Sequence, residues 1–197
     1  MTQEAKPPLE SKPEFEPITI KRALISVADK TGLVDFAKSL ADLGIEMKTT
    51  SGTWHFLLKN GLEGWEVGQV SSYEHLHGKI KTLDSKVFMS ILADRNNPAE
   101  MQEIKEAWVL SGQYTFDLVV VNLYQDKIDV GGYALLRAAV KNYHQVVSVC
   151  DSANYSSVLE QLRENNKTIS HEISYNLAAK TLDYLEESAR QAKFLLR

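Results

Sequence analysis

The clearest buried strand of this chain is the stretch Asp117-Leu-Val-Val-Val-Asn-Leu123. Its apolar residues follow one another instead of alternating with polar ones, which is typical of a parallel sheet that helices cover on both faces. Similar runs occur at Arg22–Ala28, Ile45–Thr49 and Val146–Cys150, and Glu66–Val70 is predicted as a further short strand. The sequence therefore predicts an α/β fold with a mostly parallel sheet.

Helical periodicity fills the segments between these strands. After Asp29, which we expect to cap the helix, apolar residues recur at helical spacing from Leu33 to Leu43, and Gly44 ends the segment. The other predicted helices are a short one from the Thr50–Thr53 turn to Lys59, Lys86–Ala93, Pro98–Leu110 with Asn97 as its cap, Gly132–Lys141, Asp151–Asn165 and Ser170–Leu196. This alternation predicts three layers, with the sheet between two layers of helices.

Composition excludes several classes of protein. The 197 residues, 44% of them hydrophobic, suit one globular domain, and the single cysteine, Cys150, excludes an internal disulfide. A net charge of −4 argues against a protein that coats nucleic acid. The longest apolar stretch, around Leu118–Val121, is too short to cross a bilayer, and Met1–Leu9 lacks the features of a secretory signal. We therefore expect a cytoplasmic protein that binds neither nucleic acid nor a membrane.

The first residues differ in composition from the rest of the chain. Residues 1–17 hold four of the five prolines, together with glutamates and lysines. This mixture buries too little apolar surface to offset the conformational entropy that ordering would cost. We expect residues 1–18 to be a flexible extension and residues 19–197 to form the folded domain.

Polar segments after the predicted strands mark the expected binding site. In open α/β sheets, ligands bind beyond the carboxyl ends of the strands, in loops that lead into helices. The turn Thr49–Thr53 combines hydroxyl groups, a glycine and the N–H groups of a helix start, which suit a phosphate that Lys30 can neutralise. Lys79 and Lys81 would project to the same side of an extended segment. Taken singly, such a turn is more often a simple cap, and such a lysine is more often a solvated surface residue.

Five sequence blocks point to one family. They are Ser26-Val-Ala-Asp-Lys-Thr-Gly-Leu-Val-Asp-Phe-Ala, the turn Thr49-Thr-Ser-Gly-Thr53, Gly78-Lys-Ile-Lys-Thr-Leu, Asp117-Leu-Val-Val-Val-Asn-Leu-Tyr, and Ile128-Asp-Val-Gly-Gly followed by Leu136-Arg-Ala-Ala-Val-Lys-Asn. With these blocks in this order, the chain closely resembles the IMP cyclohydrolase domain of the bifunctional AICAR transformylase/IMP cyclohydrolase. The resemblance covers about residues 20 to 190 and implies a methylglyoxal-synthase-like fold.

The resemblance also implies an activity and a set of site residues. The activity is closure of the last purine ring, in which formyl-AICAR gives IMP and water without a metal or an organic cofactor. The implied catalytic residues are Lys81, Tyr124, Asp129 and Lys141. The implied substrate-binding residues are Ser26, Lys30, Thr50, Gly52, Thr53, Lys79, Thr82, Asn122 and Gly131. A homodimer, and a separate transformylase that supplies formyl-AICAR, are further expectations.

The implied catalytic residues suit this chemistry. An amide nitrogen is a weak nucleophile, so ring closure needs proton removal at nitrogen and charge stabilisation at the formyl oxygen. Lysine and tyrosine side chains can act on that oxygen, and Asp129 can orient or deprotonate the carboxamide. Each residue also has a purely structural interpretation: Tyr124 as an aromatic residue at a strand end, Asp129 as a helix cap, and Lys141 as the partner of a helix dipole.

Two alternative functions remain open from the sequence. One is a non-catalytic nucleotide-binding or regulatory module of the same fold, like the allosteric domain of carbamoyl-phosphate synthetase. Altered turns favour it, such as Ser51-Gly52 where the family has two glycines. The other is methylglyoxal synthase, whose glycine-rich aspartate motifs find no match here. The pair His75 and His77 lacks carboxylate or thiol neighbours and is interpreted as part of a polar loop, not as a metal site.

Overall fold

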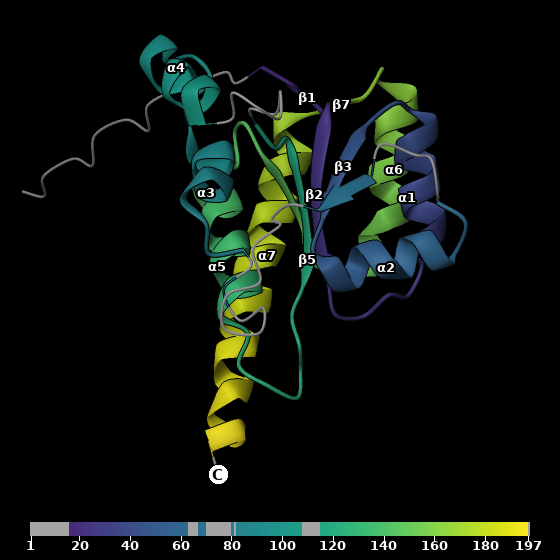
Figure 1. Cartoon of the computed structure of the whole chain (residues 1–197), viewed down its shortest axis with the longest axis vertical. Helices are drawn as coiled ribbons and strands as arrows, with labels where there is room; N and C mark the ends of the chain where they lie inside the picture. Colours follow the sequence, from purple (N-terminus) through teal and green to yellow (C-terminus); the bar gives the residue numbers. More distant parts are fainter. Residues whose placement is uncertain (1–15, 63–66, 70–79, 81, 108–114, 197) are drawn as a thin grey trace, which may run out of the picture.

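A five-stranded parallel sheet forms the centre of the molecule (Figure 1). The computed structural model describes residues 16–62, 67–69, 80, 82–107 and 115–196. Its strands are β2 (Arg22–Val27), β3 (Glu46–Thr49), β4 (Val67–Gln69), β5 (Leu118–Asn122) and β6 (Val147–Val149), arranged β4-β3-β2-β5-β6. Each neighbouring pair is parallel. The predicted α/β class is confirmed.

One layer of helices covers the first face of this sheet. It consists of α1 (Leu33–Asp42), α2 (Ser51–Lys59) and α6 (Tyr155–Glu164), which lie on the same side in Figure 1. Strand residues such as Ile25 and Val120 form a buried cluster with Phe36 of α1 and Val158 of α6. The ring of Phe36 stacks on that of Tyr155, with their centroids 4.1 Å apart.

A second layer of helices covers the other face. It contains α3 (Ser85–Leu92), α5 (Val130–Lys141) and α7 (His171–Ala192), while α4 (Pro98–Ala107) packs beside α3. Val119 and Val121 of β5 belong to the buried cluster on this face, whereas Val120 belongs to the cluster on the first face. Because successive strand residues point to opposite faces, a strand covered on both sides has to be apolar at every position. This explains the run of valines and confirms the three layers.

A small antiparallel sheet lies outside the central one. It pairs β1 (Ile18–Thr19) with β7 (Thr168–Ile169), and Ile18 stands opposite Ile169. The sequence did not predict either strand, because two residues are too few to produce an alternating pattern. Ile18 and Ile20 are both buried, so the folded part already includes Ile18, one residue before the expected boundary at residue 19.

Three helix starts differ from the prediction. α1 begins after Gly32, whose φ of 68° is left-handed, and Asp29 does not cap it. Instead, Asp29 Oδ1 accepts hydrogen bonds from the backbone N–H and the hydroxyl of Thr31, at 3.0 and 2.7 Å. α5 begins at Val130, two residues earlier than expected, with Asp129 as its cap. The segment expected as one helix from Asp151 starts with a 3-10 turn, Ser152–Asn154, before α6.

A buried ion pair between Asp117 and Arg95 lies at the amino ends of β2 and β5. Asp117 lies directly before β5, and its carboxylate lies 3.1 Å from the guanidinium of Arg95. The same carboxylate accepts hydrogen bonds from the backbone N–H groups of Lys21 and Arg22, at 2.7 and 2.8 Å. This network is at the end of the sheet away from the carboxyl ends, so its role is structural.

No described helix has the length and apolar character needed to span a membrane.

Candidate functional site

The strand order creates a crevice between β2 and β5. From β2 the chain builds the sheet outward through β3 and β4, and from β5 it builds in the opposite direction through β6. The loops that follow β2 and β5 therefore diverge, and such a switch point is where open α/β sheets bind ligands. A cavity of about 630 Å³ lies there, within the usual size range of small-molecule sites.

Most of the predicted site residues line this cavity. They are Ser26, Lys30, Thr50, Gly52, Thr53, Thr82, Asn122, Tyr124, Asp129 and Gly131. They come from segments that are far apart in the sequence, and the parallel sheet brings them together because the carboxyl ends of its strands lie along one edge. Lys79 and Lys81 lie outside the described residues.

The start of α2 forms one wall of the cavity. Thr50 is the N-cap, and its side chain makes no capping bond, so it does not occupy the N–H groups of the first turn. The Thr50 hydroxyl instead lies 3.2 Å from Ser26 Oγ, across the ends of β3 and β2. A Cβ built on Gly52 would meet nothing within 4 Å, so this glycine faces open space. A helix start next to hydroxyl groups is an arrangement in which proteins often bind anions.

Lys30 brings a positive charge to the same wall. Its ammonium donates a hydrogen bond to the carbonyl of Val27 and lies 3.4 Å from Thr53 Oγ1. The side chain is half-buried, and this burial lowers its pKa, although the nearby Asp29 acts in the opposite direction. An anion in the cavity would add a second opposite charge and favour the charged form of this half-buried ammonium.

The start of α5 forms a second wall. Asp129 Oδ1 accepts a hydrogen bond from the N–H of Gly132 at 2.8 Å, so the expected capping role of this aspartate is present in the structure. A Cβ at Gly132 would lie 2.8 Å from Asp129 Oδ2 and also 2.8 Å from Leu123 Cδ2. A Cβ at Gly131 would come closer than 3.0 Å to the hydroxyl of Thr82. Gly132 therefore allows close packing against the carboxylate, and Gly131 allows close packing against Thr82.

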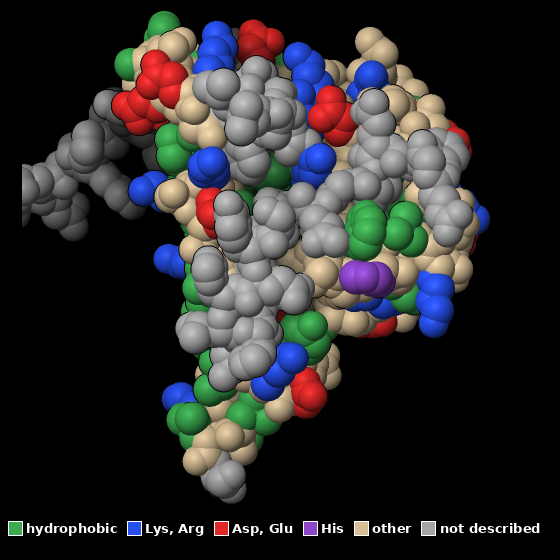
Figure 2. All heavy atoms as spheres, viewed as in Figure 1, with side chains coloured by type: hydrophobic (Ala, Val, Ile, Leu, Met, Phe, Trp, Pro, Cys, Tyr) green, Lys and Arg blue, Asp and Glu red, His purple; other side chains and the backbone are tan. Residues whose placement is uncertain are grey.

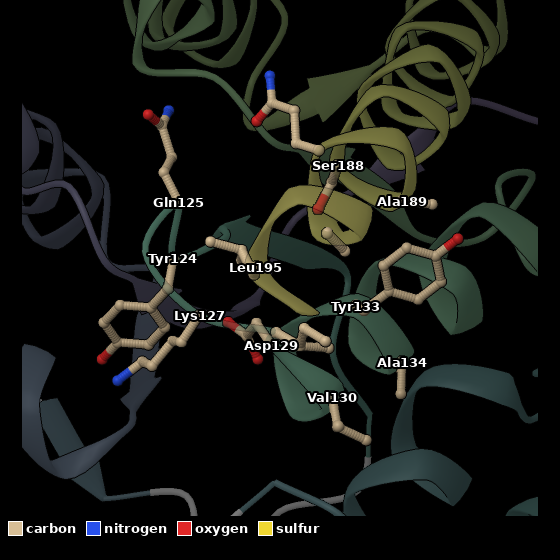
Figure 3. Close-up of a pocket in the computed structure, with 13 residues that line it drawn as sticks. Tyr124, Gln125, Lys127, Asp129, Val130, Tyr133, Ala134, Ser188, Ala189 and Leu195 are labelled. Carbon is tan, nitrogen blue, oxygen red and sulfur yellow. The ribbon is translucent and has the colours of Figure 1, made fainter. Parts of the chain in front are cut away.

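Tyr124 and Lys127 lie in the connection from β5 to α5. Tyr124 is 46% exposed, and the Lys127 ammonium lies 3.5 Å from the centroid of its ring in a cation–π contact. In Figure 3 these two side chains lie together, on the other side of Asp129 from Tyr133. Lys127 lines the cavity as well, yet sequence reasoning did not select it. The only available signal was its position in the polar connection between two predicted site residues.

The structure places Lys141 away from the cavity. This residue is the last of α5 and is exposed, whereas Asp129 caps the first turn of the same helix. Twelve helical residues separate the two ends by roughly 16 Å. Lys141 therefore does not line the cavity. Within a single chain it lies away from Asp129 and Tyr124. Its position at a helix C-terminus agrees with the alternative interpretation as a dipole partner.

A second, more apolar cavity adjoins the first. Its volume is about 440 Å³, and it lies between the start of α5 and the end of α7. Tyr124, Asp129 and Val130 line both cavities. The end of α7 projects from the body of the molecule at the bottom of Figures 1 and 2, and Phe194 and Leu196 just beyond it are exposed.

Among the described side chains, no group of three histidines, cysteines or carboxylates could hold a metal ion.

The fold and the cavity together define a class of protein: a doubly wound α/β domain with a crevice at its topological switch point. The family model of the MGS-like domain matches residues 32–143, more than half of the chain, and the chain belongs to this family. The match includes α2, both walls of the cavity around Thr50–Thr53 and Asp129–Gly132, and Lys141. The methylglyoxal-synthase-like fold implied by the sequence blocks is thus confirmed, and the family includes enzymes.

A solved structure supports the same fold over nearly the whole chain. It is titled "Crystal structure of ForH", and it is 28% identical in sequence with a TM-score of 0.77. The match covers 91% of this chain and 99% of that one. The likeness therefore extends beyond the family match to α6 and α7, which complete the two helical layers.

Proposed function

We propose that this protein closes the last ring of a purine nucleotide and converts formyl-AICAR to IMP and water. The observation that supports this most is the meeting of two walls at one cavity. Lys30 and the start of α2 offer a cradle for a phosphate, while Tyr124, Asp129 and the start of α5 offer polar groups for the reacting base. The order of the five sequence blocks supports the same activity.

The proposed reaction needs no external reagent. A bond forms between the carboxamide nitrogen and the formyl carbon, and the formyl oxygen leaves as water. The two protons of that water come from the carboxamide nitrogen and from the formamido nitrogen. Since the reacting groups belong to one molecule, holding them in contact supplies a large part of the acceleration.

The residues of the second wall have distinct proposed roles. The Asp129 carboxylate, held in place by Gly132, accepts the proton or the hydrogen bond of the carboxamide nitrogen. The N–H groups of Val130 and Gly131 are not those that Asp129 caps, and they remain as donors toward a developing negative charge on the formyl oxygen. The Tyr124 hydroxyl is a further donor for this oxygen. Lys81 and Lys141 keep only the roles that the family resemblance implies.

The proposal is tested by mixing the purified protein with formyl-AICAR and following IMP formation by absorbance. Asp129→Asn should lower the rate by about 10²- to 10⁴-fold, the usual range for loss of a general acid or base. Asparagine is as good an N-cap as aspartate, so the fold should survive. Asp126→Asn is the matched control, because Asp126 is exposed in the same connection and lines neither cavity. Full turnover by Asp129→Asn would refute the assignment.

One observation favours a second candidate function, a non-catalytic nucleotide-binding module. The exposed position of Lys141 leaves the proposed catalytic set incomplete among the described residues. This candidate predicts saturable binding of IMP with no rate of ring closure above that of the uncatalysed reaction. The same assay, combined with calorimetric titration of IMP, therefore separates the two functions.

A further inference from the structure

The side chain of Asn122 joins the end of β5 to the loop between β2 and α1. Its Oδ1 accepts hydrogen bonds from the backbone N–H groups of Ala28 and Asp29, at 2.5 and 2.9 Å. Its Nδ2 donates to the carbonyl of Asp29 at 2.9 Å. A single amide thus makes three bonds to two consecutive residues that lie more than ninety positions earlier in the chain.

The sheet register explains why this amide can reach the loop. Asn122 is the last residue of β5 and stands opposite Val27, the last residue of β2. The orientation of the amide is also determined, because a flipped amide would place its N–H₂ group against two N–H donors. Three of the four hydrogen bonds open to an asparagine side chain are then used within the protein. The sequence implied that Asn122 contacts a ligand directly. Only one N–H of its side chain remains available for such a contact.

The loop held by Asn122 leads directly to Lys30. The Lys30 ammonium bonds to the carbonyl of Val27, which lies just before the clamped residues, and it approaches Thr53 at the start of α2. The path of residues 27–30 therefore decides where this charge stands in the cavity. We propose that Asn122 is a positioning residue, which holds the β2–α1 loop so that Lys30 faces a phosphate group of the ligand. This inference rests on the phosphate cradle of the proposed function, but not on ring closure.

A double-mutant cycle tests whether Asn122 acts through Lys30. The probe is ribose 5-phosphate, and its dissociation constant is measured by calorimetric titration of the full chain. Asn122→Ala should weaken binding about tenfold in the wild-type background, and less than about twofold when Lys30→Met is already present. Additive losses would overturn the proposal, because they would mean that Asn122 and Lys30 contact the ligand independently.

Asn142 provides a matched control. Its Nδ2 also clamps a backbone turn, with bonds to the carbonyls of Ile91 and Ala93 at 2.8 and 3.3 Å, and it does not line the cavity. Asn142→Ala should therefore leave the affinity for ribose 5-phosphate unchanged. A loss equal to that of Asn122→Ala would overturn the proposal in favour of general loosening of the fold.

A second measurement reports on the loop itself. Hydrogen exchange at the amides of Ala28 and Asp29 should accelerate in Asn122→Ala and stay as in the wild type in Asn142→Ala. Unchanged exchange at both amides would overturn the proposal even if affinity falls. Absence of any binding of ribose 5-phosphate to the wild type would overturn both the cradle and the positioning role. Phosphate binding without ring closure would refute the proposed activity alone.

Discussion

Replacing Gly131 with alanine should destabilise the protein, although alanine is the better helix former. The new Cβ would lie closer than 3.0 Å to the hydroxyl of Thr82, a separation that real Cβ atoms essentially never show. Ordinary contact begins at 3.4 Å, so one of the two groups has to move. Thr82 is only 7% exposed and lies shortly before the start of α3.

The expected magnitude follows from two opposing effects. Alanine gains about 0.5 to 1 kcal/mol over glycine inside a helix. Overpacking a filled site costs about 1 to 3 kcal/mol, so the expected net loss is about 1 kcal/mol. Gly52→Ala is the matched control in the first turn of α2, because its Cβ would meet nothing within 4 Å. This control should keep the helical gain and become slightly more stable than the wild type.

The assay is urea denaturation followed by far-ultraviolet circular dichroism, with the free energy of unfolding compared at equal m-values. The decisive background is Thr82→Ala, which removes the hydroxyl that the new Cβ would meet. In that background Gly131→Ala should be neutral or stabilising. An equal loss of stability with and without the Thr82 hydroxyl would refute the reasoning. A free energy of unfolding equal to that of the wild type for the single variant Gly131→Ala would refute it as well.

Two further predictions concern charged groups. Burial lowers the pKa of Lys30 in the folded state, so the stability contributed by this group is present above its ordinary value of 10.5 and is lost as the pH falls through the lowered value. The wild type should therefore gain stability relative to Lys30→Met as the pH rises across that window in urea titrations, and an opposite trend would contradict the assignment. Asp117→Ala breaks the buried pair with Arg95 and should cost about 3 to 5 kcal/mol in the same assay. Arg190→Ala removes only exposed pairs with Glu186 and Glu187 and should change stability by about 0.5 kcal/mol or less; equal effects would contradict this view of the Asp117 network.

Much of the central fold could be predicted from local patterns. The consecutive apolar residues of β5 and β2 require cover on both faces, and this requirement alone implies a parallel sheet between two helical layers. Gly44 ends α1 with a φ of 66°, and Asn97 caps α4 with a bond from the N–H of Ala99 to its side chain, both as the sequence indicated. Short elements were missed because their signal depends on a partner: β1 exists only through its pairing with β7.

The location of the candidate site could be predicted in part, because it depends on the direction in which the strands run. Parallel strands place all their carboxyl ends at one edge, so the segments after β2, β3 and β5 were expected along that edge. The strand order, with β2 between β3 and β5, makes these segments neighbours. Lys141 lies at the far end of α5, and the sequence alone does not show how far this helix carries it from that edge. Lys127 was missed because its contact with the Tyr124 ring involves no motif.

The sequence by itself determined the class of fold, the edge of the sheet that carries the site, and the residue types available there, since hydrophobic periodicity and strand direction are local properties. Only the tertiary structure decided what each side chain does at that edge. Asn122, which the family resemblance implied as a ligand contact, uses three of its hydrogen bonds on Ala28 and Asp29. This role depends on the register between β2 and β5 and on contact between segments more than ninety residues apart, which no local pattern encodes.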